Sequence, residues 1–207
     1  MIRIWGRVNS VNVQKVLWAL AELDLAYERI DAGLQFGVVD SPAYRTMNPN
    51  ALVPTMDDDG FVLWESNVIV RYLATKYGMD TLCPGGLRQR FTAECWMDWQ
   101  QTSLNPPISS VFVNLIRLPP EERDGSAVAK GCEAAERSLA ILDEQLAAGF
   151  YLVGDSFSMA DIPAGASASR WYKLPIERRR RHAQVERWLA RLAERPGFRA
   201  HVDRPLS

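Results

Sequence analysis

The sequence has few of the residues that build disulfide frameworks and metal sites. Its 207 residues include three cysteines, Cys83, Cys95 and Cys132, and no C-x-x-C pair. The two histidines, His182 and His201, lie late in the chain and far from other ligand-type residues. Scattered cysteines in odd number argue against a disulfide scaffold or a zinc site. We therefore expect no metal and a reducing compartment.

The sequence also lacks long apolar runs and an excess of charge of either sign. No basic segment followed by an apolar stretch stands at its start, and no run approaches the ~20 apolar residues of a membrane helix. These absences predict a soluble, cytoplasmic protein without a membrane partner. The formal net charge is -1, so no long-range field would gather nucleic acid. The one basic block, residues 178–181, is more simply a solvated helix start than a binding patch.

Residues 1–78 mix strand and helix signals. Asp58-Asp59-Gly60 is a hairpin signature between two apolar segments. A mixed sheet covered by helices is the natural packing for the order of elements seen here. Alternating patterns predict short strands at 2–5, 27–31, 55–57 and 61–64, with helical spacing at 13–23 and from 65 onward.

The remainder of the chain has only helical periodicity. Residues 79–86 contain Pro84, Gly85 and Gly86 and form the predicted linker between a first domain, 1–78, and a second, 87–207. The predicted fold class is an α/β N-terminal domain followed by an all-α C-terminal domain. Apolar residues recur at helical spacing over 91–102, 128–146, 158–171 and 183–193.

The loop 7–12 joins the first predicted strand to the first predicted helix and contains Ser10 and Asn12. A helix start presents unpaired N–H groups and partial positive charge, which stabilise an anion such as a thiolate. A hydroxyl and an amide there can both donate to sulfur. Lowering a thiol pKa by two units from about 8.5 requires roughly 2.7 kcal/mol, which one charge-assisted hydrogen bond and a helix terminus can supply. The simpler interpretation is that Ser10 or Asn12 only caps the helix.

Two further segments suit a peptide-like ligand. A cis bond between Val53 and Pro54, just before a predicted strand, would expose the Val53 N–H and C=O to pair with such a ligand as an added strand does. Glu65 and Ser66 open the next helix, where a carboxylate suits an ammonium group and a hydroxyl with helix N–H groups suits a carboxylate. They therefore match an α-amino acid end. The simpler interpretations are a trans turn and an ordinary helix cap.

Together these segments resemble the glutathione transferase superfamily. Asn48–Pro54 resembles its N-P-x-x-x-V-P segment, and Glu65–Ile69 resembles its E-S-x-A-I segment. Phe157–Ile162 resembles its structural capping motif, in which Ser158 caps a buried helix and Asp161 returns the bond. The resemblance extends across the chain. It implies a thioredoxin-like first domain that binds glutathione and a helical second domain that holds the co-substrate pocket.

The resemblance also implies roles for the site residues. It implies a cis Val53–Pro54 bond, with the Val53 backbone pairing to the cysteinyl part of glutathione. The resemblance also implies that Glu65 and Ser66 bind the γ-glutamyl end of glutathione. Ser10 matches the serine of the serine-type classes, and Asn12 matches an asparagine of some bacterial and fungal relatives. The loop lacks the tyrosine of other classes.

The chain departs from the family pattern where the glycyl carboxylate of glutathione is bound. Ala51 and Leu52 stand where many relatives have Lys, Arg or Gln. Recognition of that carboxylate has to come from elsewhere, and Gln35 or Asn50 are the candidates.

Asp98 is a further candidate on the first helix of the second domain. It shares a predicted helix face with Phe91 and Cys95, where an unpaired carboxylate would be costly. In the family this helix lines the dimer interface and the cleft, and in some classes its polar residues reach the γ-glutamyl amine in the partner subunit. Asp98 is a candidate for that role, with a structural hydrogen bond as the alternative.

The sequence thus predicts a cytoplasmic, homodimeric glutathione S-transferase of the detoxification type. Glutathione is the co-substrate, its thiol ionises beside Ser10 and Asn12, and the thiolate attacks a small electrophilic or apolar compound without a metal. Two alternatives stay open. One is a glutathione-dependent oxidoreductase acting on disulfides or peroxides, and the other is a non-catalytic binding or regulatory protein of the same fold. The absence of C-x-x-C excludes dithiol exchange by protein cysteines in this loop.

Overall fold

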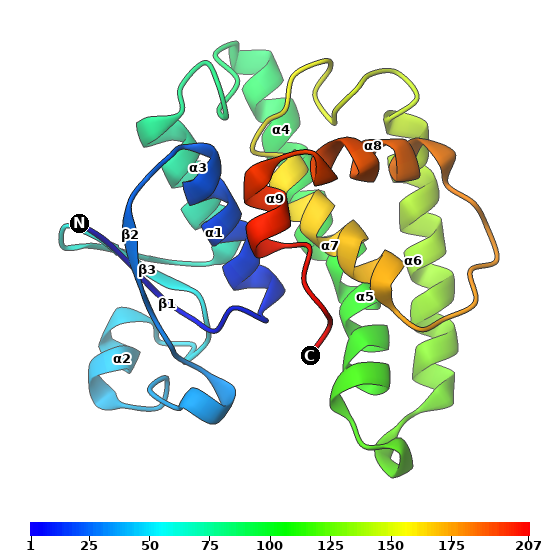
Figure 1. Ribbon diagram of the computed structural model, residues 1–207, viewed down its shortest axis with the longest axis horizontal. Helices are drawn as coiled ribbons and strands as arrows, with labels where there is room; N and C mark the ends of the chain where they lie inside the picture. The colour runs from blue at the N-terminus through cyan, green and yellow to red at the C-terminus, as the bar shows by residue number, and fades with distance from the viewer.

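A four-stranded mixed sheet forms the first part of the computed structural model, which describes residues 1–207 (Figure 1). The strand order is β2-β1-β3-β4. β1 is parallel to β2 and antiparallel to β3, and β3 is antiparallel to β4. The strands are β1 (Ile2–Trp5), β2 (Tyr27–Ile30), β3 (Thr55–Asp58) and β4 (Phe61–Trp64). This confirms the predicted mixed sheet.

Helices pack on the sheet according to the alternation of its side chains. Ile2 and Ile4 belong to the main core together with α1 (Val11–Glu22) and α3 (Ser66–Tyr77). Trp5 belongs instead to a separate small core with Ala32 and with Tyr44 of α2 (Pro42–Met47). Both faces of β1 are therefore covered at its C-terminal end, whereas Arg3 nearer its start is exposed. A short 3-10 turn, η1 (Leu34–Phe36), lies between β2 and α2.

The hairpin between β3 and β4 turns on two residues, as its sequence predicts. Asp59 has φ 51° and Gly60 has φ 92°. Two successive positive φ values are typical of the turn that matches the right-handed twist of paired strands.

Helices make up the rest of the chain, beyond an irregular segment at 78–86. None of them combines the length and the apolar character that crossing a bilayer requires. Their order agrees with the predicted fold class. They are α4 (Leu87–Trp99), η2 (Gln100–Leu104), α5 (Asn105–Phe112), η3 (Val113–Arg117), η4 (Pro120–Glu122), α6 (Gly125–Gln145), α7 (Asp161–Lys173), α8 (Ala183–Ala193) and α9 (Pro196–His201).

Two segments of the helical run from α4 to η3 are wound more widely than an α-helix. The segments η2 and η3 are π-helical, and α5 between them begins with Asn105 followed by Pro106 and Pro107. Proline has no N–H to donate to the preceding turn, so a widened turn is a natural solution at this point. The predicted interruption at the proline pair is therefore a change of helix type, and the chain continues in the same helical run.

One core joins the sheet to the helices. It contains 40 buried residues from both parts of the chain. Trp18 of α1 is fully buried, and its ring lies 5.1 Å from Phe198 of α9 and 5.5 Å from Phe157 before α7 (centroid distances). Gly165 and Gly197 come so close to Trp18 that a Cβ on either would crowd its ring. Close packing against α1 thus fixes how the helical part of the chain is oriented relative to the sheet.

The predicted capping motif is present at the start of α7. Asp161 accepts hydrogen bonds from the Ser158 N–H at 2.9 Å and from the Ser158 hydroxyl at 3.2 Å. The Ser158 hydroxyl accepts in turn from the Ala160 N–H. Asp161 also accepts from the Leu152 N–H and from the indole of Trp188 in α8. Burial raises the pKa of Asp161 to about 6.

The basic block 178–181 differs from the expected solvated helix start. It precedes α8, and Arg178 folds back to donate to the carbonyl oxygens of Trp171 and Leu174 at 3.1 and 3.3 Å. The guanidinium therefore satisfies the free carbonyls at the end of α7, a common use of arginine near a helix C-terminus. The other three arginines of the block are exposed.

Candidate active site

The three segments singled out in the sequence meet at one edge of the sheet. Trp5 pairs with Thr55, and Thr55 pairs with Trp64. The loop that follows β1, the Val53–Pro54 bond that precedes β3, and the start of α3 that follows β4 therefore lie at the same edge. The topology brings together Ser10, Val53 and Ser66, which are far apart in the sequence.

Ser10 sits at the N-cap position of α1, and Asn12 lies in its first turn. Ser10 is 8% exposed and has extended φ and ψ of -85° and 121°. Its side chain makes no capping hydrogen bond. The hydroxyl is therefore not used as a helix cap, which removes the simpler interpretation of this serine. Asn12 is half-buried.

The Val53–Pro54 peptide bond is cis, as the resemblance implied. The Leu52 carbonyl before it accepts from the Tyr44 hydroxyl at 2.7 Å and from the Asn48 side-chain amide at 2.9 Å. Tyr44 and Asn48 are both buried, and their hydrogen bonds fix Leu52 next to the cis bond. The N–H and C=O of Val53 take no part in the main-chain hydrogen bonds of the chain. Both groups are thus available to a ligand.

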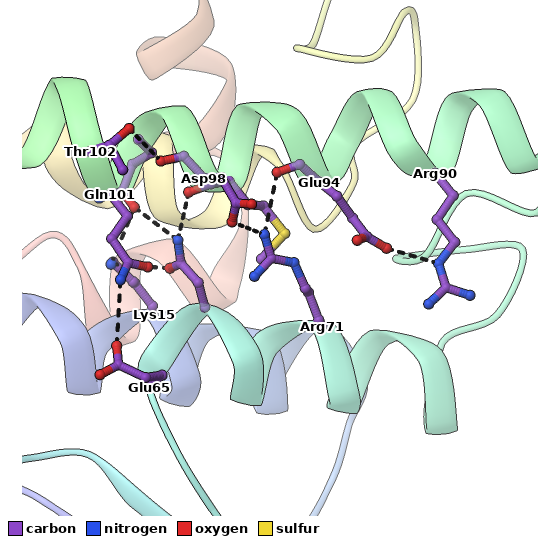
Figure 2. Close-up of polar contacts among 11 residues, drawn as sticks. Lys15, Glu65, Arg71, Arg90, Glu94, Asp98, Gln101 and Thr102 are labelled. Carbon is purple, nitrogen blue, oxygen red and sulfur yellow. Dashed lines mark hydrogen bonds and ion pairs between the residues drawn. The ribbon is translucent and has the colours of Figure 1, made fainter.

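Glu65 and Ser66 begin α3 in different surroundings. Glu65 has φ 70° and is exposed, and its carboxylate accepts from the side-chain amide of Gln101 at 3.5 Å (Figure 2). Ser66 is buried, and its hydroxyl accepts from the ammonium group of Lys15 at 3.4 Å. Positive φ at a residue other than glycine is a strained backbone position that clusters at functional sites.

Lys15 is a buried neighbour of the candidate site that sequence reasoning missed. It is 2% exposed within α1, and besides Ser66 it donates to Asn67 at 3.2 Å and to Gln100 at 3.4 Å. Gln100 also donates to Ser167 of α7 at 2.7 Å. We call these five residues the lysine network. Burial and the charge of Arg170 lower the pKa of Lys15 to about 7, against the opposing charge of Glu65. The only sequence signal is a single lysine inside an apolar helix.

Asp98 is not on a buried face. Its side chain is 71% exposed and forms an ion pair with Arg71 of α3, which also donates to the Glu94 carbonyl at 3.3 Å (Figure 2). The expectation of a costly, otherwise apolar setting is wrong for this chain, because α4 buries Ala93 and Met97 and leaves Phe91 exposed.

Gln35 and Asn50 lie in the loops around the same edge. Gln35 is exposed within η1, and Asn50 is exposed with its main-chain N–H donating to the Asn48 side chain at 3.1 Å. Neither side chain is held in place by another part of the chain. Nowhere in the structure do three or more His, Cys, Asp or Glu side chains gather in a way that would hold a metal ion.

Comparison with known families accounts for most of the chain. Residues 1–75 match the glutathione S-transferase N-terminal domain, and residues 104–196 match the glutathione S-transferase C-terminal domain. The chain belongs to the glutathione S-transferase family. The resemblance drawn from the sequence is thus confirmed, as is the two-part glutathione S-transferase fold.

Individual members of the glutathione S-transferase family match along the full length. The chain is 41% identical over 209 residues to glutathione S-transferase GstB of Escherichia coli (strain K12), with all of both chains covered. It is 30% identical to glutathione S-transferase 3 of Zea mays, covering 97% of this chain and 93% of that one. A crystal structure of the theta class glutathione S-transferase from Xanthomonas axonopodis pv. citri, with glutathione bound, superposes with a TM-score of 0.96. It has 41% identity and covers 100% of this chain and 99% of that one.

Proposed function

We propose that this member of the glutathione S-transferase family binds glutathione at the sheet edge and activates its thiol for attack on a small electrophile. The observation that supports this most is the meeting of Ser10, Val53 and Ser66 at one edge, where the Ser10 side chain caps no helix N–H and the Val53 N–H and C=O make no main-chain hydrogen bond. The family membership and the glutathione-bound relative of the same fold support it further.

Ser10 is the proposed donor to the glutathione sulfur, with Asn12 in support. Ser10 lies at the start of α1, where unpaired N–H groups and the helix dipole favour a thiolate. One charge-assisted hydrogen bond contributes about 1.5–3 kcal/mol, which is enough to lower a thiol pKa by one to two units. The reaction gains further from holding thiolate and electrophile together, and it requires no metal.

The rest of glutathione is assigned along the edge. Val53 pairs with the cysteinyl part beside Pro54, and Glu65 and Ser66 hold the γ-glutamyl end, whose ammonium and carboxylate suit an acidic side chain and a helix start. Gln35 and Asn50 are nearest to the glycyl end.

A homodimer completes the proposal. The face formed by α3, α4 and β4 leaves Val68, Phe91 and Phe61 exposed, and a second copy of the chain would cover them. Asp98 lies on this face, from which it would reach the γ-glutamyl amine in the partner. The free cysteines and the use of reduced glutathione support a cytoplasmic location.

The test is the ultraviolet absorbance of thiolate for bound glutathione, measured across a pH series for wild type, Ser10→Ala and Asn12→Ala. Wild type should lower the thiol pKa, and Ser10→Ala should return it toward about 8.5. An equal drop in wild type and Ser10→Ala would move the role to Asn12 or the helix terminus. The absence of bound thiolate in every variant would end the transferase proposal.

A further inference from the structure

The ammonium group of Lys15 is enclosed by neutral acceptors. Lys15 is buried and reaches from α1 toward α3 and η2 (Figure 2). Its three N–H groups have three partners. These are the Ser66 hydroxyl at 3.4 Å and the side-chain oxygens of Asn67 at 3.2 Å and Gln100 at 3.4 Å. The charge therefore has a full set of hydrogen bonds, but no carboxylate is among the acceptors.

Two of the three acceptors are fixed in orientation by further bonds. The Asn67 side-chain amide donates to the Met97 carbonyl at 2.7 Å and to the Gln100 side-chain oxygen at 3.1 Å. The Gln100 side-chain amide donates to the Ser167 hydroxyl at 2.7 Å. Both amide groups are thus held with their oxygens toward Lys15.

The third acceptor, Ser66, keeps its own hydroxyl hydrogen for another partner. Its oxygen accepts from Lys15, and the hydrogen has no acceptor within the chain. Ser66 is buried and is the first residue of α3, where the proposed function puts the γ-glutamyl carboxylate. An ammonium group only donates, so the hydroxyl cannot turn its hydrogen toward a charged Lys15. A charged Lys15 therefore leaves this hydrogen to a ligand.

A neutral Lys15 would have the opposite effect on Ser66. A neutral amine has a lone pair and accepts the hydroxyl hydrogen, which takes that hydrogen away from the ligand. A hydroxyl that accepts from a cation is also polarised, and it donates more strongly to an anion. The protonation of Lys15 thus changes both the direction and the strength of the hydrogen bond that Ser66 offers.

The surroundings of Lys15 permit both protonation states near neutral pH. Burial and the charge of Arg170 on α7 lower the pKa of Lys15 to about 7, while the charge of Glu65 at the start of α3 opposes them. A carboxylate bound at Ser66 would favour the charged form, because an opposite charge within about 4–6 Å of a titrating group does so.

Other charged groups on the elements around Lys15 are paired among themselves. On α3, Arg71 pairs with Asp98 of α4. The helix α9 packs on α1 near Glu22, and Arg195 just before α9 pairs with Glu22. The segment η2 faces the ammonium with the neutral Gln100.

We propose that Lys15 is a positioning residue for glutathione, which turns the Ser66 hydroxyl toward the γ-glutamyl carboxylate and takes up a proton when that carboxylate binds. This rests on the proposed function and specifies how one end of glutathione is recognised. The proton comes from the solvent and adds to the Lys15 amine, and no other covalent bond changes. Below about pH 7 Lys15 is already charged, so the affinity is highest there. Above that pH the proton has to be taken up, so the affinity falls by up to about tenfold per pH unit.

Calorimetric titration with S-methylglutathione measures the proton uptake. This ligand has no thiol, so neither thiol ionisation nor reaction contributes. Titrations at pH 7.5 in phosphate and in Tris, which differ in ionisation enthalpy, give the number of protons taken up from the difference in binding enthalpy. If binding raises the pKa of Lys15 by about one unit, wild type should take up roughly half a proton at pH 7.5. Its affinity should then fall about sixfold between pH 6.5 and pH 8.5.

Three variants test whether the proton goes to Lys15. Lys15→Arg stays charged, so it should keep the affinity at pH 6.5, lose the decline at higher pH and take up no proton. Lys15→Met should bind weakly at every pH, again without uptake. Lys130→Met is the matched control, because Lys130 is exposed on α6, and it should behave as wild type. The amine of the ligand titrates alike in all of these proteins and cancels in the comparison.

A change in the ligand tests the same link without altering the protein. In γ-aminobutyryl-S-methylcysteinylglycine the γ-glutamyl carboxylate is missing and the amine is kept, so wild type should bind it without proton uptake. Ser66→Ala should likewise lose most of the uptake of S-methylglutathione binding, because the hydroxyl that joins Lys15 to the carboxylate is gone. These two measurements give the answer if a Lys15 variant does not fold.

Three results would overturn the proposal while leaving the proposed function intact. One is binding of S-methylglutathione to wild type without proton uptake. Another is equal uptake in wild type and Lys15→Met, because the proton would then go to a different group. The third is equal uptake with the ligand that lacks the carboxylate. Failure of S-methylglutathione to bind wild type at all would instead contradict the proposed function itself.

Discussion

Two sets of cations in the molecule differ in what satisfies them. The lysine network places one buried ammonium among three neutral acceptors, from Ser66, Asn67 and Gln100. Arg117 and Arg170 instead stack on the ring of Phe112, and Arg117 donates to an oxygen of Ser207, the last residue of the sequence. A fully buried cation thus takes a full set of hydrogen-bond acceptors, whereas half-buried guanidinium groups are held by an aromatic ring and a single oxygen.

The largest effect is expected at Ser10. Ser10→Ala removes a hydroxyl that caps no helix N–H, so the stability of the protein should change little. The value of kcat/KM near pH 6.5 should fall by about 10- to 100-fold, since one donor to a developing anion is lost. Steady-state kinetics with thermal unfolding as a parallel measurement would check this. A large loss of stability together with unchanged kinetics would mean that the serine serves the fold alone.

Lys15→Met tests whether the lysine network is scaffold. Methionine fills a similar volume, but it leaves the oxygens of Ser66 and Asn67 without the Lys15 donor, while the Gln100 oxygen keeps the Asn67 amide at 3.1 Å. This loss should cost about 1–3 kcal/mol of unfolding free energy. Because Ser66 is proposed to hold the γ-glutamyl end of glutathione, the KM for glutathione should rise several-fold with a smaller change in kcat. Lys130→Met is the control, since Lys130 is exposed on α6. A variant with wild-type stability would show that the network contributes nothing.

The pH dependence of stability should also report on Lys15. Its pKa is lowered by burial from 10.5 to about 7. Between those values the unfolded chain binds a proton that the folded chain does not, so unfolding free energy from this group rises with pH. The slope is up to about 1.4 kcal/mol per pH unit. Below about pH 7 the penalty for the charged, buried ammonium is complete. Urea titrations of wild type and Lys15→Met across pH 6.5–10 should give curves that converge or cross, and parallel curves would contradict the shift.

Most of the fold could be predicted from the sequence, and so could the parts of the candidate site that lie in short segments. The hairpin at Asp59-Gly60, the cis bond at Val53–Pro54 and the capping pair Ser158 and Asp161 each have a local signature that the structure bears out. They could be found because the physics of a turn or a cap acts over a few residues.

The missing parts depend on contacts between distant residues. Lys15, Gln100 and Ser167 are separated by more than sixty residues at each step, so no spacing rule brings them together. Lys15 could not be found from periodicity, because a helix that is buried almost all round gives no sign of which polar residue will be enclosed. Asp98 was misplaced because α4 buries a different stripe from the one through Phe91 and Cys95.

The π-helical segment η2 makes the arrangement of the side chains after it depend on the number of residues in this helix. Gln100 and Gln101 are neighbours in the chain, yet one faces Lys15 and Ser167 while the other reaches Glu65. One residue more or fewer in this turn would rotate everything after it by about 100°. Phe112 would then turn away from Arg170 of α7, although no side chain had been replaced. In the divergence of such chains, a single-codon insertion or deletion here would separate the two halves of the site more completely than most point substitutions.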